Sequence, residues 1–107
     1  MPQVPPPEPP ALRCTLTQNV ENGTVSLGGM VFSDSVRGGS YRLKVVKSGP
    51  SGSSILNQGG LFEIDPPQAS KIGEMTFSLE VGARFHAHLV VMSDGKTAEC
   101  EDGNERL

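Results

Sequence analysis

Residues 40–64 read SYRLKVVK, SGPSGSS and ILNQGGLFEI in succession, a pattern typical of a β-hairpin. Apolar and polar side chains alternate along 40–47, and a period of two indicates a strand that buries one face. The Gly-, Pro- and Ser-rich residues 48–54 supply the turn between the two strands. We expect the outward face of this hairpin to carry Arg42 and Lys44, with Lys47 at the end of the strand.

The same alternation recurs in short runs along the rest of the chain. The turn signals Glu21-Asn-Gly23 and Ser93-Asp-Gly95 contain residues that readily adopt a positive φ, and Asp65-Pro-Pro67 ends a strand because proline lacks a backbone donor. The sequence therefore predicts an all-β fold, an immunoglobulin-like antiparallel β-sandwich of about seven strands. The expected strands are Leu12–Gln18, Gly23–Ser33, Ser40–Lys47, Ser53–Ile64, Lys71–Leu79, Arg84–Met92 and Lys96–Glu101.

Alternation also assigns the inward side chains, which would fill the space between two sheets. After Gly28 and Gly29 the sequence does not determine which side chains face inward. Met30 and Phe32 lie on the face opposite to that of the preceding apolar residues unless a bulge inserts one residue there. The residues expected to face inward are Leu12, Cys14, Leu16, Val25, Leu27, Tyr41, Leu43, Val45, Phe62, Ile64, Met75, Phe77, Leu79, Phe85, Ala87, Leu89, Val91, Ala98 and Cys100.

A length of 107 residues predicts one domain. Six of the first ten residues are proline, which favours an extended polyproline conformation, so we expect 1–11 to be a disordered tail or linker. The domain would span 12–102, followed by a flexible end at 103–107. No apolar run approaches the ~20 residues that span a bilayer, and no charged-then-apolar leader precedes the prolines, so we expect a signal peptide to be missing from this chain.

Two cysteines, Cys14 and Cys100, lie near opposite ends of the expected domain, on the inward faces of its first and last strands. A disulfide between them would destabilise the unfolded chain by about 4–5 kcal/mol, because it closes a long loop. Such a bond requires an oxidising compartment, which favours the periplasm or the cell exterior. The alternative is a pair of reduced, buried cysteines in a cytosolic protein.

The sequence contains no motif that indicates catalysis. His86 and His88 share one face of a strand and could ligate a metal, but no third histidine exists; the alternative is two solvated side chains. No Gly-x-Ser-x-Gly elbow, no phosphate-binding glycine loop before a helix and no Cys-x-x-Cys pair is present. We therefore expect no enzyme activity, no cofactor and no metal.

Charge is unevenly distributed along the chain. Arg37, Arg42, Lys44 and Lys47 fall within eleven positions that contain no carboxylate, although the formal net charge is −3. This local basic patch predicts either a docking face for an acidic partner or a device that discourages edge-to-edge strand pairing. It is too narrow for sustained phosphate binding, so we expect no nucleic-acid partner.

Three segments resemble the curli assembly inhibitors of the CsgH/CsgC type: 39–54, 57–62 and 91–95. The resemblance covers most of 12–101 and is strongest to the CsgH branch. It implies a periplasmic, monomeric protein that prevents amyloid polymerisation of the curli subunit before its secretion, with no ATP, cofactor or membrane partner. The client would bind a basic strand face or a strand edge, and the candidate binding residues are Arg42, Lys44, Lys47 and Arg37.

A generic extracellular adhesion or carbohydrate-binding β-sandwich is the alternative. That class predicts exposed aromatic platforms or an Asp-rich calcium loop, whereas the single tyrosine, Tyr41, is expected to face inward and no such loop occurs. A small copper or zinc enzyme built on His86 and His88 would lack further ligands.

Overall fold

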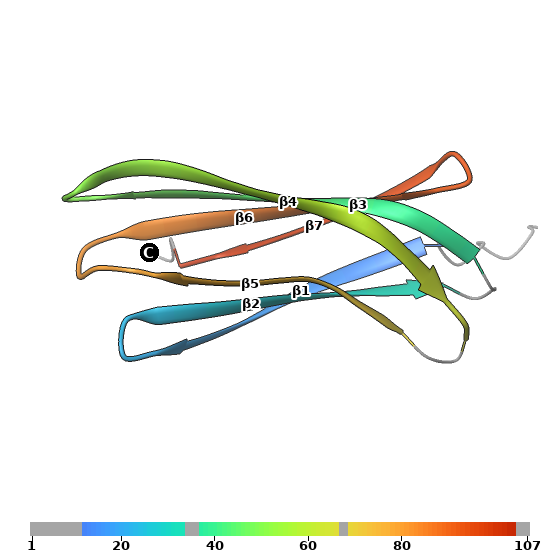
Figure 1. Cartoon of the computed structure of the whole chain (residues 1–107), viewed down its shortest axis with the longest axis horizontal. Coiled ribbons are helices and arrows are strands. Elements are labelled where there is room, and N and C mark those ends of the chain that lie inside the picture. The colour runs from blue at the N-terminus through green and yellow to red at the C-terminus, as the bar shows by residue number, and fades with distance from the viewer. Residues whose placement is uncertain (1–11, 34–36, 67–68, 105–107) are drawn as a thin grey trace, which may run out of the picture.

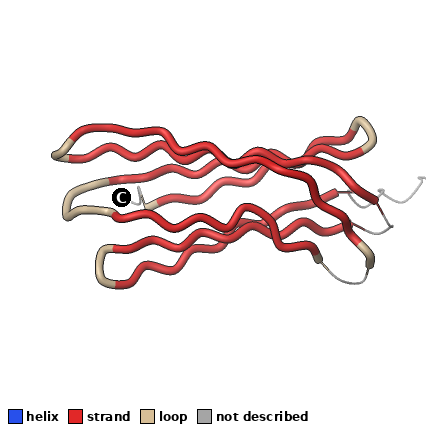
Figure 2. The backbone as a smooth tube through the Cα atoms, in the orientation of Figure 1, coloured by secondary structure: helices blue, strands red, loops and turns tan. Residues whose placement is uncertain are grey.

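The computed structural model describes residues 12–33, 37–66 and 69–104, and for Arg37 it describes the backbone alone. These residues form long strands joined by short turns (Figure 2). Each predicted strand is present, and the third begins three residues earlier and ends two residues later than expected. The strands are β1 (Leu12–Glu21), β2 (Thr24–Ser33), β3 (Arg37–Gly49), β4 (Gly52–Ile64), β5 (Ser70–Ser78), β6 (Arg84–Ser93) and β7 (Lys96–Gly103).

The strands form two sheets that pack as two layers (Figure 1). One sheet has the order β1-β2-β5 and the other β4-β3-β6-β7, and every neighbouring pair is antiparallel. Sheets stacked in this way bury the inward-facing side chains of both layers. The predicted immunoglobulin-like sandwich is confirmed, with β4 paired to β3 in the four-stranded sheet.

The core lies between the two sheets. Every residue that was expected to face inward is buried or packs against the buried cluster. The rings of Phe77 and Phe85 meet edge to face across the layers, with centroids 5.3 Å apart. The residues predicted to face inward did not include Val31 and Ile72, which are buried, or Leu56, which is partly buried.

The open question of phase in β2 is answered by a bulge in its neighbour, β5. Leu27 lies opposite Met75 and Gly29 opposite Ile72, so β5 contains one residue more than β2 over this interval. Gly73 adopts a φ of 66°, a left-handed conformation that glycine reaches without steric cost. The extra residue turns Ile72 into the core, while alternation in β2 continues without a break.

A disulfide between Cys14 and Cys100 confirms the predicted bridge. It joins β1 to β7, the edge strands of different sheets, with a Cα–Cα distance of 6.0 Å. Beside it, Gln18 Nε2 donates a hydrogen bond to the carbonyl oxygen of Gly103 at 3.0 Å. This flank of the sandwich is therefore closed by a covalent bond.

At the C-terminal end, β7 continues one residue past the expected domain boundary at residue 102. Gly103 belongs to β7, and Asn104 Oδ1 accepts a hydrogen bond from the backbone N–H of Phe85 at 2.7 Å. Residues 1–11 and 105–107, expected to be flexible, lie outside the described part of the chain. Among the described residues, no helix has the length and apolar character needed to cross a bilayer.

Candidate binding face

The outer surface of the four-stranded sheet, here called the outer face, carries the two central candidate residues. Arg42 and Lys44 are exposed, whereas Leu43 and Val45 beside them are buried, so β3 alternates as predicted. The register places Arg42 between Gly59 and Val90, and Lys44 between Asn57 and His88.

Neither cation is neutralised by a carboxylate among the described residues. Their partners on β4 are uncharged, because Gly59 has no side chain and Asn57 is neutral. Two exposed cations at the centre of a sheet, with no carboxylate partner in the described residues, can attract an acidic binding partner and raise the rate at which it associates.

Lys47 does not share this face. It has the same parity along β3 as the buried Leu43 and Val45, and its ammonium lies over the ring of Phe77, 5.4 Å from the centroid. A cation over an aromatic ring is held by the ring's negative face. Grouping Lys47 with Arg42 and Lys44 was therefore wrong in placement, because period-two alternation puts odd and even residues on opposite sides. The side chain of Arg37 lies outside the described structure.

The two histidines lie on the outer face of β6 and reach carboxylates on β7. His86 Nε2 is 2.9 Å from Glu101 Oε1, and His88 Nε2 is 2.8 Å from Glu99 Oε1. The sequence predicted either metal ligands or two solvated side chains here and did not predict the contacts with glutamates, because this pairing depends on the register across the β6–β7 hairpin. In the described parts of the chain, no cluster of three or more His, Cys, Asp or Glu side chains could hold a metal ion. The outer face is thus polarised, cationic on β3 and acidic on β7.

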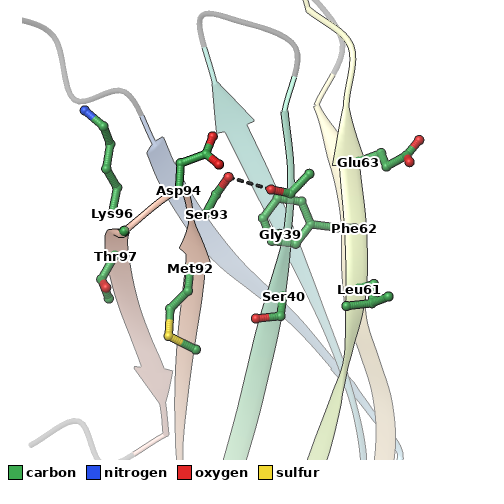
Figure 3. A pocket seen from close by; sticks show the side chains of 12 residues that line it. Gly39, Ser40, Leu61, Phe62, Glu63, Met92, Ser93, Asp94, Lys96 and Thr97 are labelled. Carbon is green, nitrogen blue, oxygen red and sulfur yellow. Dashed lines mark hydrogen bonds between the residues drawn. The ribbon is translucent and has the colours of Figure 1, made fainter.

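A groove of about 810 Å³ hollows one end of the outer face (Figure 3). Its floor is Gly38, Gly39 and Ser40 of β3, where small residues leave space between the side chains of the flanking strands. We call this hollow the end groove. Its walls are Leu61, Phe62 and Glu63 of β4 and Met92, Ser93, Asp94, Gly95, Lys96 and Thr97 of the β6–β7 hairpin.

The floor of the end groove is closely packed from beneath. A Cβ atom on Gly39 would clash with the carbonyl oxygen of Met92 and lie 2.8 Å from Phe62 Cζ. Ser93, which is 3% exposed, donates a hydrogen bond from Oγ to the carbonyl oxygen of Gly38 at 2.6 Å. The position of the floor strand is therefore set by contacts that leave no room for a larger residue at Gly39.

Large apolar side chains stand at both ends of the outer face. Leu61 is 85% exposed and Met92 41% exposed beside the end groove, and the directly paired Val46 and Ile55 are exposed at the opposite end. None of these four residues was among the predicted binding residues. The alternation along each strand could have indicated their exposure, because it places them on the same outward side of the paired strands as Arg42 and Lys44.

These features define a class of protein: an immunoglobulin-like β-sandwich with an open face that combines a basic centre with apolar ends. The family model of the CsgH protein matches residues 13–103. The chain therefore belongs to the CsgH family.

Solved structures agree with this assignment. The solution structure of CsgH from R. palustris has a TM-score of 0.69 and 29% sequence identity, covering 84% of this chain and 89% of that chain. The curli protein CsgC of E. coli has a TM-score of 0.72 at 14% identity, covering 84% of this chain and 96% of that chain, which shows a common fold. No curated protein gives a significant match to the sequence.

Proposed function

We propose that this protein is a periplasmic, non-enzymatic inhibitor that keeps the curli subunit from polymerising into amyloid before its secretion. The observation that carries the proposal is the pair Arg42 and Lys44, exposed at the centre of the outer face without a carboxylate partner among the described residues. Membership of the CsgH family and the common fold with a curli protein support the curli-associated role. The disulfide supports an oxidising compartment such as the periplasm.

The proposed mechanism needs no active site. An amyloid-forming subunit becomes hazardous when identical strands begin to stack, so inhibition requires only that early paired species be occupied or deflected. Electrostatic attraction to Arg42 and Lys44 would raise the encounter rate with acidic segments of the client, and the complex would be transient because exposed charges contribute little lasting affinity.

Charge reversal tests this proposal. Thioflavin fluorescence would follow polymerisation of purified curli subunit with the protein present well below equimolar concentration. We expect the wild type to lengthen the lag phase several-fold and R42E/K44E to lose that effect, because reversed charges repel acidic segments. R13E/K71E is the matched control, since it reverses two exposed cations on the other sheet and changes the net charge equally.

The possible outcomes test the inhibitor function and the binding surface separately. Undiminished inhibition by folded R42E/K44E would eliminate the basic centre as the binding surface. Absence of inhibition by folded, oxidised wild-type protein would eliminate the proposed function itself.

A strand edge is the second surface that could act on the client. β4 is an edge strand of 13 residues whose sole charged side chain is Glu63, and it contains neither the lysine nor the proline that commonly protects edges. In the described part of the chain, the middle of β4 is linked to β5 by a hydrogen bond that Gln58 Nε2 donates to the carbonyl oxygen of Glu74 at 3.0 Å. Slowed hydrogen exchange along β4 in the presence of client would identify β-augmentation, whereas side-chain docking on the outer face would leave that exchange unchanged.

A further inference from the structure

We propose that the end groove receives a bulky apolar side chain from an extended client segment, and that the same segment presents acidic side chains to Arg42 and Lys44. The inference rests on the proposed function for the identity of the client. It adds a rule for which client segments are recognised. The segment carries an apolar residue in the end groove, and acidic residues two and four positions further along lie over Arg42 and Lys44.

The shape of the end groove favours a large facing side chain. A segment lying on the outer face would pack as a facing layer, and stacked layers are about 10 Å apart. Small floor residues such as Gly38 and Ser40 leave that space empty unless the facing residue is large. A volume of about 810 Å³ is ample for an aromatic or branched side chain.

Apolar side chains flank the floor of the end groove. Leu61 and Met92 both lie directly opposite Ser40, one on β4 and one on β6, so they flank the floor at the same level. Figure 3 shows both side chains beside the groove. Leu61 is 85% exposed, and an apolar side chain that entered the groove would remove part of this apolar surface from water.

The spacing of side chains along β3 matches that of an extended client segment. Ser40, Arg42 and Lys44 form one row on β3, and each two-residue step along a strand covers about 6.6–6.8 Å. An extended client has the same repeat, so a side chain in the end groove places its alternate neighbours over Arg42 and Lys44. The charged side chains at the far rim of the groove are Glu63, Asp94 and Lys96, two acids and one base, whereas Arg42 and Lys44 on the other side are both positive, so a client carboxylate is favoured on the side of Arg42 and Lys44. Charge complementarity therefore orients the segment.

Two blocked peptides test the rule directly. The first, TFTETET, carries the proposed pattern, and the second, TSTETET, replaces only the aromatic residue. Titration of isotope-labelled wild-type protein, followed by NMR, should show methyl shifts at Leu61 and Met92 with the first peptide and about tenfold weaker binding of the second, because burial of an aromatic side chain is lost.

Variants of the protein supply the controls. L61S/M92T removes the apolar walls and should bind both peptides equally. S40F places an aromatic ring on the floor between Leu61 and Met92, where the client side chain would lie, and should lose the preference for TFTETET. V81S removes an apolar side chain that is 96% exposed on the β5–β6 turn, and should keep the tenfold preference.

Equal binding of the two peptides by the wild type, or an unchanged preference in folded L61S/M92T, would overturn the inference. Curli polymerisation assays on the same samples separate the two proposals. If the wild type inhibited curli polymerisation but bound both peptides equally, only the role proposed for the end groove would be refuted. If it preferred TFTETET but did not inhibit polymerisation, only the proposed function would be refuted.

Discussion

At the residue scale, Gly28 and Gly29 of β2 show that the face on which a strand residue lies determines whether there is room for one added methyl group. A Cβ on Gly28 would meet nothing nearer than Thr17 Oγ1 at 3.7 Å. A Cβ on Gly29 would lie 2.9 Å from Leu89 Cδ2 and 3.0 Å from the carbonyl oxygen of Ile72. Gly29 faces the core, where overpacking forces neighbours out of their preferred rotamers.

Alanine substitution at each glycine provides a matched pair. We expect G29A to lower the free energy of unfolding by about 1–3 kcal/mol, because the backbone carbonyl of Ile72 cannot move aside cheaply. G28A should change it by no more than about 0.5 kcal/mol, as is usual for surface positions. Urea denaturation of both variants measures the difference, and equal destabilisation would contradict the register in which Gly29 alone faces inward.

At the element scale, the sandwich is held differently along its two flanks. β1 and β7 belong to different sheets, and the Cys14–Cys100 disulfide ties them covalently. On the opposite flank, β4 and β5 are linked by the hydrogen bond from Gln58 to Glu74. The bulge at Gly73 bends β5 and turns Ile72 into the core. The flank with β4 therefore retains an accessible strand edge.

Removal of the disulfide tests the contribution of the closed flank. The two cysteines are separated by 86 positions, so C14A/C100A should lower the free energy of unfolding by about 4–5 kcal/mol in the chain-entropy model. Urea denaturation with and without reductant provides the measurement. Reductant should shift the wild type toward the variant and leave the variant unaffected; a wild type of unchanged stability after verified reduction would contradict this account.

At the scale of the whole molecule, charge separates across one sheet. Arg42 and Lys44 occupy β3, while Glu99 and Glu101 occupy β7 and engage the histidines of β6. The net charge of −3 conceals this polarity. Because the cations are exposed, their attraction acts mainly on the rate of encounter and is screened by salt.

Ionic strength should therefore distinguish the basic centre from the end groove. We expect the association rate with labelled curli subunit to fall about tenfold between ~50 mM and ~500 mM salt. R42E/K44E should lack this decline, and the preference for TFTETET over TSTETET should persist at high salt because apolar burial is not screened. Stopped-flow fluorescence measures the rates, and a wild-type rate independent of salt would contradict electrostatic steering.

Much of this protein was predictable because strand alternation and turn chemistry are local properties of the chain. The seven strands, the sandwich class, the inward residues and the exposure of Arg42 and Lys44 all follow from period-two patterns interrupted by Gly, Asn, Asp and Pro. The disulfide was also predictable, because the cysteines occupy inward positions of the first and last strands.

The tertiary structure decided what depends on register between strands distant in sequence. It placed Lys47 over Phe77, paired His86 and His88 with glutamates, and located the extra residue in β5 rather than β2. The end groove likewise exists only where Gly38–Ser40 lie between the larger side chains of β4 and the β6–β7 hairpin. Alternation specifies which face a residue occupies, but only the packed sheets determine which side chains become neighbours on that face.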